Sequence, residues 1–176
     1  MSVRTRSLLT VLSVLVLAVT ITWFLVGVRA QLAVGYSCAS GGPYEIVNPC
    51  PQHTTSLVLV GMFLSLVPAL AGTMASLSVG APNLLVPYWT FTLGGLSLLL
   101  LISSVQDGWV FGAFIAVMLG LLFGLPGLYL MSPWQRVYDR EPVKDAPLSR
   151  NQWWLVYLVV GAIGAFVGSW TANAWL

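Results

Sequence analysis

The stretch LLTVLSVLVLAVTITWFLVGV (residues 8–28) contains no Asp, Glu, Lys, Arg or His. About 20 consecutive apolar residues are what an α-helix needs to cross the ~30 Å hydrocarbon core of a bilayer. Four more stretches of similar length also lack charged groups, at about 56–79, 84–105, 109–131 and 153–176. The sequence therefore predicts a polytopic membrane protein built from five transmembrane helices.

Composition supports this prediction across the whole chain. Charged residues make up 7% of the 176 positions and hydrophobic residues 58%, whereas ordinary soluble domains contain roughly 25% charged residues. The charged residues and the single His lie between or before the apolar stretches. A net charge of +2, divided between both signs, does not suggest nucleic acid as a partner. Pumps usually keep an ionisable group inside the bilayer, so this pattern also argues against proton-coupled transport.

Helices are the expected form of the five stretches because backbone groups in lipid must be paired within each segment. Strands of a barrel would instead alternate over about 10 residues, and this alternation is absent. We expect an all-α bundle that forms a single membrane domain over residues 1–176. Pro68 and Pro126 fall inside the second and fourth spans, where they can kink the axis.

The distribution of basic residues predicts the orientation of the chain. Arg4 and Arg6 precede the first span, and the loop 132–152 contains four more basic residues. Since Arg and Lys concentrate in cytoplasmic loops, we expect the N-terminus and this loop in the cytoplasm, and the loop 29–55 and the C-terminus outside. Trp153 and Trp154 then fall at the inner membrane boundary. We expect a multi-pass protein of the plasma membrane, and the excess of Arg over Lys hints at a bacterial inner membrane.

The N-terminal stretch also has a second interpretation. A basic start, an apolar run and the small residue Ala30 resemble a secretory signal that is cleaved after Ala30. The run at 8–28 is longer than the 7–15 residues usual in such signals, which favours a retained first span.

The predicted outer loop contains the two cysteines of the chain, Cys38 and Cys50. On an oxidising side of the membrane they are expected to form a structural disulfide, which stabilises a loop of this length by about 3 kcal/mol. A redox-active pair is an alternative, but catalytic dithiols are usually spaced Cys-x-x-Cys. A metal site made with Glu45 and His53 is another, although the spacing matches no zinc pattern.

Small and hydroxylated residues recur inside the spans. We expect glycines to let helices approach closely in the fourth and fifth spans, at Gly120, Gly124, Gly161, Gly164 and Gly168. The hydroxyl groups are expected to bind carbonyl oxygens one turn back. A permeation path would instead be lined by the hydroxyl-rich pairs at the inner ends of the second and third spans, which are Thr73, Ser76, Thr90 and Thr92.

Asp107 lies in the turn between the third and fourth spans. Its position before the fourth span predicts an N-terminal cap, because the helix dipole favours negative charge there.

The sequence contains no pattern typical of a catalytic triad, a phosphate loop or a haem site. We therefore expect no enzyme activity, no cofactor and no metal. The main hypothesis is a structural or accessory subunit of a larger membrane complex, with the lipid bilayer and other membrane subunits, or a second copy, as partners. An oligomeric channel or facilitator for a neutral solute is the alternative, and a membrane thiol-disulfide oxidoreductase is less favoured.

Overall fold

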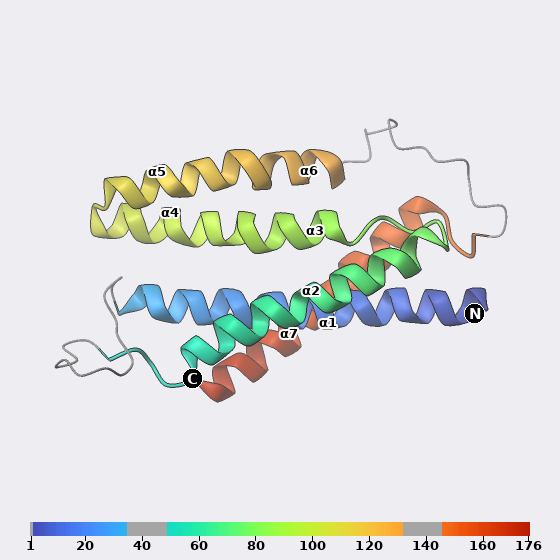
Figure 1. Ribbon diagram of the computed structural model, residues 1–176, viewed down its shortest axis with the longest axis horizontal. Helices are drawn as coiled ribbons and strands as arrows, with labels where there is room; N and C mark the ends of the chain where they lie inside the picture. Colours follow the sequence, from blue (N-terminus) through green and yellow to red (C-terminus); the bar gives the residue numbers. More distant parts are fainter. Residues whose placement is uncertain (1, 35–48, 132–145) are drawn as a thin grey trace.

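The computed structural model of the protein describes residues 2–34, 49–131 and 146–176. These residues fold into helices and contain no β-strand. In chain order the elements are α1 (Val3–Ala33), α2 (Thr54–Leu77), α3 (Leu85–Trp89), η1 (Thr90–Gly94), α4 (Gly95–Asp107), α5 (Val110–Leu119), η2 (Gly120–Gly124), α6 (Leu125–Met131) and α7 (Arg150–Trp175). Because η1 and η2 are π-helical turns, α3–η1–α4 and α5–η2–α6 each form one continuous span (Figure 1).

Five helical spans in the described part of the chain are long and apolar enough to cross a membrane. They lie on the five stretches predicted from the sequence, but α1 and α7 begin earlier than the apolar runs suggest. The Ser2 hydroxyl accepts a hydrogen bond from the Thr5 N–H (3.2 Å) at the start of α1. Ser149 and Gln152 form a capping box at the start of α7. Capping residues, rather than the first apolar residue, therefore set these helix ends.

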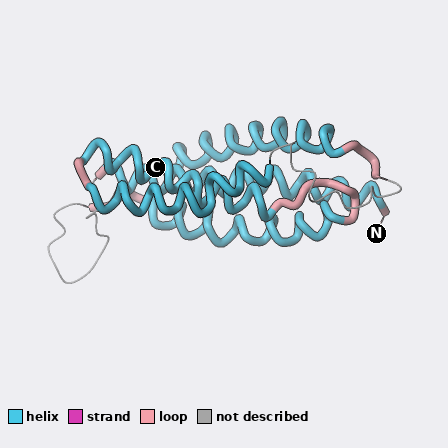
Figure 2. The backbone as a smooth tube through the Cα atoms, turned by 90° about the horizontal axis from the view of Figure 1, so that it is seen from above, coloured by secondary structure: helices cyan, strands magenta, loops and turns pink. Residues whose placement is uncertain are grey.

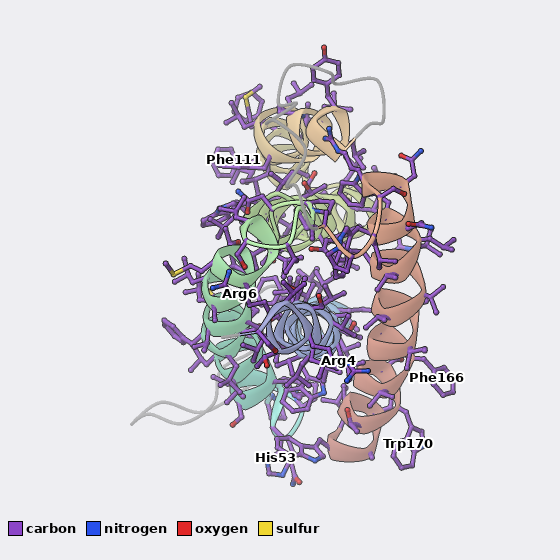
Figure 3. All side chains as sticks on the ribbon, turned by 90° about the vertical axis from the view of Figure 1, so that its right-hand side faces the viewer. Arg4, Arg6, His53, Phe111, Phe166 and Trp170 are labelled. Atoms are coloured by element: carbon purple, nitrogen blue, oxygen red, sulfur yellow. The ribbon has the colours of Figure 1, made fainter. Side chains whose placement is uncertain are left out.

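The first helix lies at the centre of the bundle. Viewed end on, α1 lies between α2 and α7, with α3–η1–α4 above it and α5–η2–α6 outermost (Figure 3). Figure 2 shows that the helices run along one common long axis. Both α2 and α7 cross α1 obliquely (Figure 1). The fold is thus a three-helix layer covered on one side by a helical hairpin.

Two clusters of buried apolar side chains join these layers through α1. One cluster contains Val14 of α1 and holds Trp153 and Tyr157, near the start of α7, against the turn between α2 and α3. The other contains Leu17 and Ile21 of α1, with buried side chains from α2 and α3. The middle of α1, from Val14 to Ile21, therefore packs against both α2 and α7.

The hairpin is held together by small residues on both of its spans. A methyl group added at Gly94 would lie 3.2 Å from the Gly124 Cα, so the two backbones are in direct contact. The Ser97 hydroxyl donates a hydrogen bond to the Ala116 carbonyl oxygen (2.7 Å) on the facing helix. Close approach through small residues is the usual way in which helices associate in lipid.

A π-helical turn directly precedes the proline of the fourth span. Pro126 is the second residue of α6, after η2 (Gly120–Gly124). Proline lacks an N–H and its ring crowds the preceding turn, and a π-turn is one way in which a membrane helix adjusts to this. Pro68 lies inside α2, which continues through it.

The predicted cap at Asp107 is wrong. Asp107 is the last residue of α4, and its carboxylate lies 3.2 Å from the Ser103 hydroxyl on the same helix. Gly108 then adopts a left-handed conformation (φ 68°) that ends α4. Trp109 occupies the N-cap position of α5 and makes no side-chain cap hydrogen bond. The turn at Gly108 therefore caps the end of the third span and not the start of the fourth.

Candidate functional site

Charged side chains in the described residues lie only near the ends of the helices. They are Arg4, Arg6, Arg29, Asp107 and Arg150. Among the same residues, no three His, Cys, Asp or Glu side chains come close enough to hold a metal ion. The middle of each described span thus offers apolar groups, hydroxyls and backbone, and its chemistry is that of packing and hydrogen bonding.

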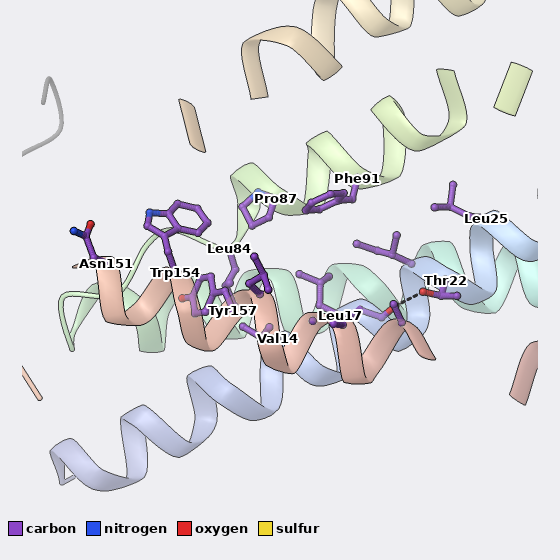
Figure 4. A pocket seen from close by; sticks show the side chains of 16 residues that line it. Val14, Leu17, Thr22, Leu25, Leu84, Pro87, Phe91, Asn151, Trp154 and Tyr157 are labelled. Carbon is purple, nitrogen blue, oxygen red and sulfur yellow. Dashed lines mark hydrogen bonds between the residues drawn. The ribbon is translucent and has the colours of Figure 1, made fainter. Parts of the chain in front are cut away.

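A groove lies on one side of α1 in the described bundle. It has a volume of about 890 Å³ and lies between α7 and the start of the hairpin, with α1 as its floor (Figure 4). Most of its lining is apolar, contributed by Val14, Leu17, Ala18, Ile21, Thr22, Leu25, Leu84, Pro87, Phe91, Asn151, Trp154, Tyr157, Leu158, Gly161, Ala162 and Ala165. Volumes of ~300–1,000 Å³ are typical of sites for small ligands.

Polar groups in the lining gather toward the end where α7 begins. Asn151 and Trp154 lie at this end, and Thr22 lies toward the other (Figure 4). The Tyr157 hydroxyl donates to the Pro82 carbonyl oxygen (2.9 Å), and the Thr22 hydroxyl donates to the Ala18 carbonyl oxygen (2.8 Å). The Asn151 amide and the Trp154 indole form no hydrogen bond with another described residue, which leaves both available to a ligand.

The hydroxyl groups considered for a permeation path are buried in helix contacts. Thr73 donates to the Ala69 carbonyl oxygen (2.7 Å) and Ser76 to the Thr73 carbonyl oxygen (2.9 Å). Thr90 and Thr92 likewise donate to carbonyl oxygens one turn back, at 2.8 and 2.6 Å. Hydroxyls bound in this way favour helix packing over a water-filled path.

The structure places the five predicted packing glycines in three settings. Gly164 and Gly168 face α1, where an added methyl group would lie 2.8 Å from the carbonyl oxygens of Leu15 and Val19 respectively. Gly120 faces the Ser97 hydroxyl across the hairpin, and Gly124 faces Gly94. Gly161 lies beside the groove, where an added methyl group would meet nothing within 4 Å.

The glycines that join α1 to α2 were not among those predicted from the sequence. A methyl group at Gly61 would lie 2.6 Å from the Phe24 nitrogen and 2.7 Å from the Thr20 carbonyl oxygen. Gly27 and Gly72 are similarly close to the facing helix. The available signal was a row of small residues along the second span, which are Gly61, Ser65, Ala69, Gly72 and Ser76, all buried.

The predicted disulfide cannot be placed in the structure. Cys38 and Glu45 lie outside the described residues, and so does most of the predicted outer loop. Cys50 and His53 are described, and they directly precede α2. The pairing of Cys38 with Cys50 therefore stays a prediction.

Comparison with protein families, with curated proteins and with solved structures finds no match to this chain.

Proposed function

We propose that the chain is a non-catalytic integral membrane protein that acts as a structural or accessory subunit of a larger membrane complex. The observation that carries this proposal is the position of α5–η2–α6. This span packs chiefly against its hairpin partner, α3–η1–α4, and has fewer buried side chains than any other span in the described bundle. No other described helix covers most of its circumference, which leaves room for the helix of a neighbouring subunit.

The free face of α5–η2–α6 contains large side chains that a partner helix could pack against. Phe111 and Phe114 are 63% and 58% exposed, and Phe111 points away from the bundle (Figure 3). Further exposed side chains continue along the span, namely Met118, Leu121, Leu122, Leu125, Leu128 and Tyr129. Each ring offers many atoms for van der Waals contact with small residues of a partner helix.

Internal hydrogen bonding supports the same role. The Thr73 and Thr92 hydroxyls donate to carbonyl oxygens of their own helices, and the Ser97 hydroxyl joins two helices. These bonds stabilise the bundle and leave little polar surface along which a solute could pass. The groove is predominantly apolar and lies at the side of α1, so it also favours binding over conduction.

We further propose a plasma-membrane location with the N-terminus in the cytoplasm, the C-terminus outside, and a Cys38–Cys50 disulfide in the first outer loop. α1 and α7 start at the same end of the bundle (Figure 1), which brings Arg4, Arg6 and Arg150 to one side. This common side supports the orientation because basic residues flank spans on the cytoplasmic side.

Affinity capture from the source membrane in mild detergent, followed by mass spectrometry, tests the proposal. Wild-type protein should return partner subunits in fixed stoichiometry. Phe111→Ala with Phe114→Ala should lower their recovery about tenfold, the change produced by ~1.4 kcal/mol of lost binding. Phe166→Ala is the matched control, since Phe166 is 76% exposed on α7, on a different side of the bundle (Figure 3).

Two results would overturn the proposal. One is recovery of the wild-type protein only as an isolated monomer. The other is passage of a neutral solute through vesicles that contain the purified protein, which a channel requires and a structural subunit does not.

A further inference from the structure

We propose that the groove between α7 and the start of the hairpin binds one acyl chain of a bilayer phospholipid, with Asn151 and Trp154 contacting its glycerol-ester and phosphate region. This inference does not depend on the role of α5–η2–α6, because no residue of that span lines the groove. It rests on where the groove opens, how large it is, and where its polar groups lie.

The groove opens sideways from the bundle. Its floor is buried, since Leu17 and Ile21 of α1 are 5% and 6% exposed, whereas Phe91 and Leu158 of its lining are 51% and 70% exposed. All four residues lie inside spans that are apolar enough to cross a membrane. The open side of the groove therefore faces hydrocarbon, and acyl chains are the molecules present there at the highest concentration.

The dimensions of the groove suit an acyl chain better than a helix. At 1.5 Å per residue, the lining from Asn151 to Ala165 extends about 20 Å along α7. This is close to the depth of one leaflet with its headgroup region, about 20 Å. A spanning helix about 10 Å wide and 30 Å long would need roughly 2,400 Å³, whereas the groove provides about 890 Å³.

The polar end of the groove matches the polar end of a phospholipid. The Asn151 amide and the Trp154 indole N–H can donate hydrogen bonds to ester carbonyl and phosphate oxygens. Arg150, the first residue of α7, adds positive charge at the same end. Tryptophan commonly lies at the level of the lipid headgroups, where its ring is in an apolar environment and its N–H is hydrated. A lipid seated here would belong to the leaflet in which α7 begins.

Gly161 provides a direct test because it lines the groove and a methyl group added there meets no protein atom within 4 Å. The purified protein is reconstituted with palmitoyl-oleoyl phosphatidylglycerol, extracted in mild detergent, and weighed by native mass spectrometry. Wild-type protein should retain one phospholipid per chain, and Gly161→Leu should lose it. Ala165→Leu, which fills the groove from a second lining position, should lose it as well.

Ala71→Leu is the matched control, since Ala71 is exposed on α2 and does not line the groove. It adds comparable bulk and should retain the lipid as the wild type does. The proposal is overturned if both filled variants retain the lipid or if the wild type retains none. It is equally overturned if the wild type runs as a dimer that Gly161→Leu dissociates, because the groove would then hold a second copy of the chain.

Discussion

The two sides of α1 show how differently two helix contacts can be made within one bundle. Toward α2, the backbones touch at Gly61, where Phe24 and Thr20 leave no room for a methyl group. Toward the hairpin, α1 is separated from Phe91 by the groove. The separation ends where Leu25 of α1 packs against Gly95, since a methyl group at that glycine would lie 3.0 Å from the leucine side chain.

This difference indicates that small residues determine where membrane helices pack closely against each other. Lipid is as apolar as leucine, so no hydrophobic force closes a gap between two helices in a bilayer. Helices come together where small side chains allow dense contact, and elsewhere hydrocarbon can occupy the space. The α1–α2 contact and the groove can therefore both be stable in the same molecule.

Gly61→Ala should produce the largest loss of stability, because the added methyl group enters the close contact between α1 and α2. The new methyl group would overlap backbone atoms of α1, which cannot move aside as a flexible side chain can. Overpacking of this kind costs about 1–3 kcal/mol, occasionally more. The free energy of unfolding, measured by titration with sodium dodecyl sulfate in mixed micelles and followed by circular dichroism, should fall by that amount.

The control for this substitution is Ala71→Leu on the exposed face of the same helix. It adds more atoms than Gly61→Ala but should leave the unfolding free energy nearly unchanged. Equal stability of Gly61→Ala and the wild type would mean that α1 and α2 are not in backbone contact.

The next largest effect is expected where α1 packs against the C-terminal end of α7. The Trp23 indole N–H donates a hydrogen bond to the Thr171 hydroxyl (2.8 Å), and Trp23 also stacks on Trp175 with ring centroids 5.8 Å apart. Thr171→Val keeps the side-chain shape and removes the acceptor. Since hydrogen bonds between membrane helices average about 0.6 kcal/mol, the loss should be of that size.

A double-mutant cycle with Trp23→Phe isolates this bond from the stacking contact. A coupling free energy of about 0.6 kcal/mol is expected. Additive effects of the two substitutions would show that the indole and the hydroxyl do not interact.

The spans themselves could be predicted from the sequence because the signal is strong. Charge is excluded from about 20 residues at a time by the cost of burying it in lipid, so the number and position of the helices follow from composition. The ends of α1 and α7 could have been placed better from Ser2 and from the pair Ser149 and Gln152, whose capping pattern is visible in the sequence.

The groove could not be predicted, because it depends on how the helices cross rather than on any one of them. Its lining comes from three separate segments of the chain, and residues such as Leu17, Phe91 and Leu158 look alike in a list of apolar residues. Which helix each glycine faces could not be predicted for the same reason. Gly161 and Gly164 lie three residues apart on one helix, yet only Gly164 faces α1.

Gly161→Ala is the smallest expected effect and the sharpest test of this distinction. An added methyl group at Gly161 meets nothing within 4 Å, and alanine favours a helix over glycine by up to about 1 kcal/mol in water. The unfolding free energy should therefore stay the same or rise slightly.

At Gly164 the same change places a methyl group 2.8 Å from the Leu15 carbonyl oxygen and from the Ala18 Cβ, so overpacking should cost about 1–3 kcal/mol. Because both changes add one methyl group to the same helix, the difference between them reports only what each glycine faces. Equal losses at the two positions would mean that α7 presents a different face to α1 and that the groove is closed.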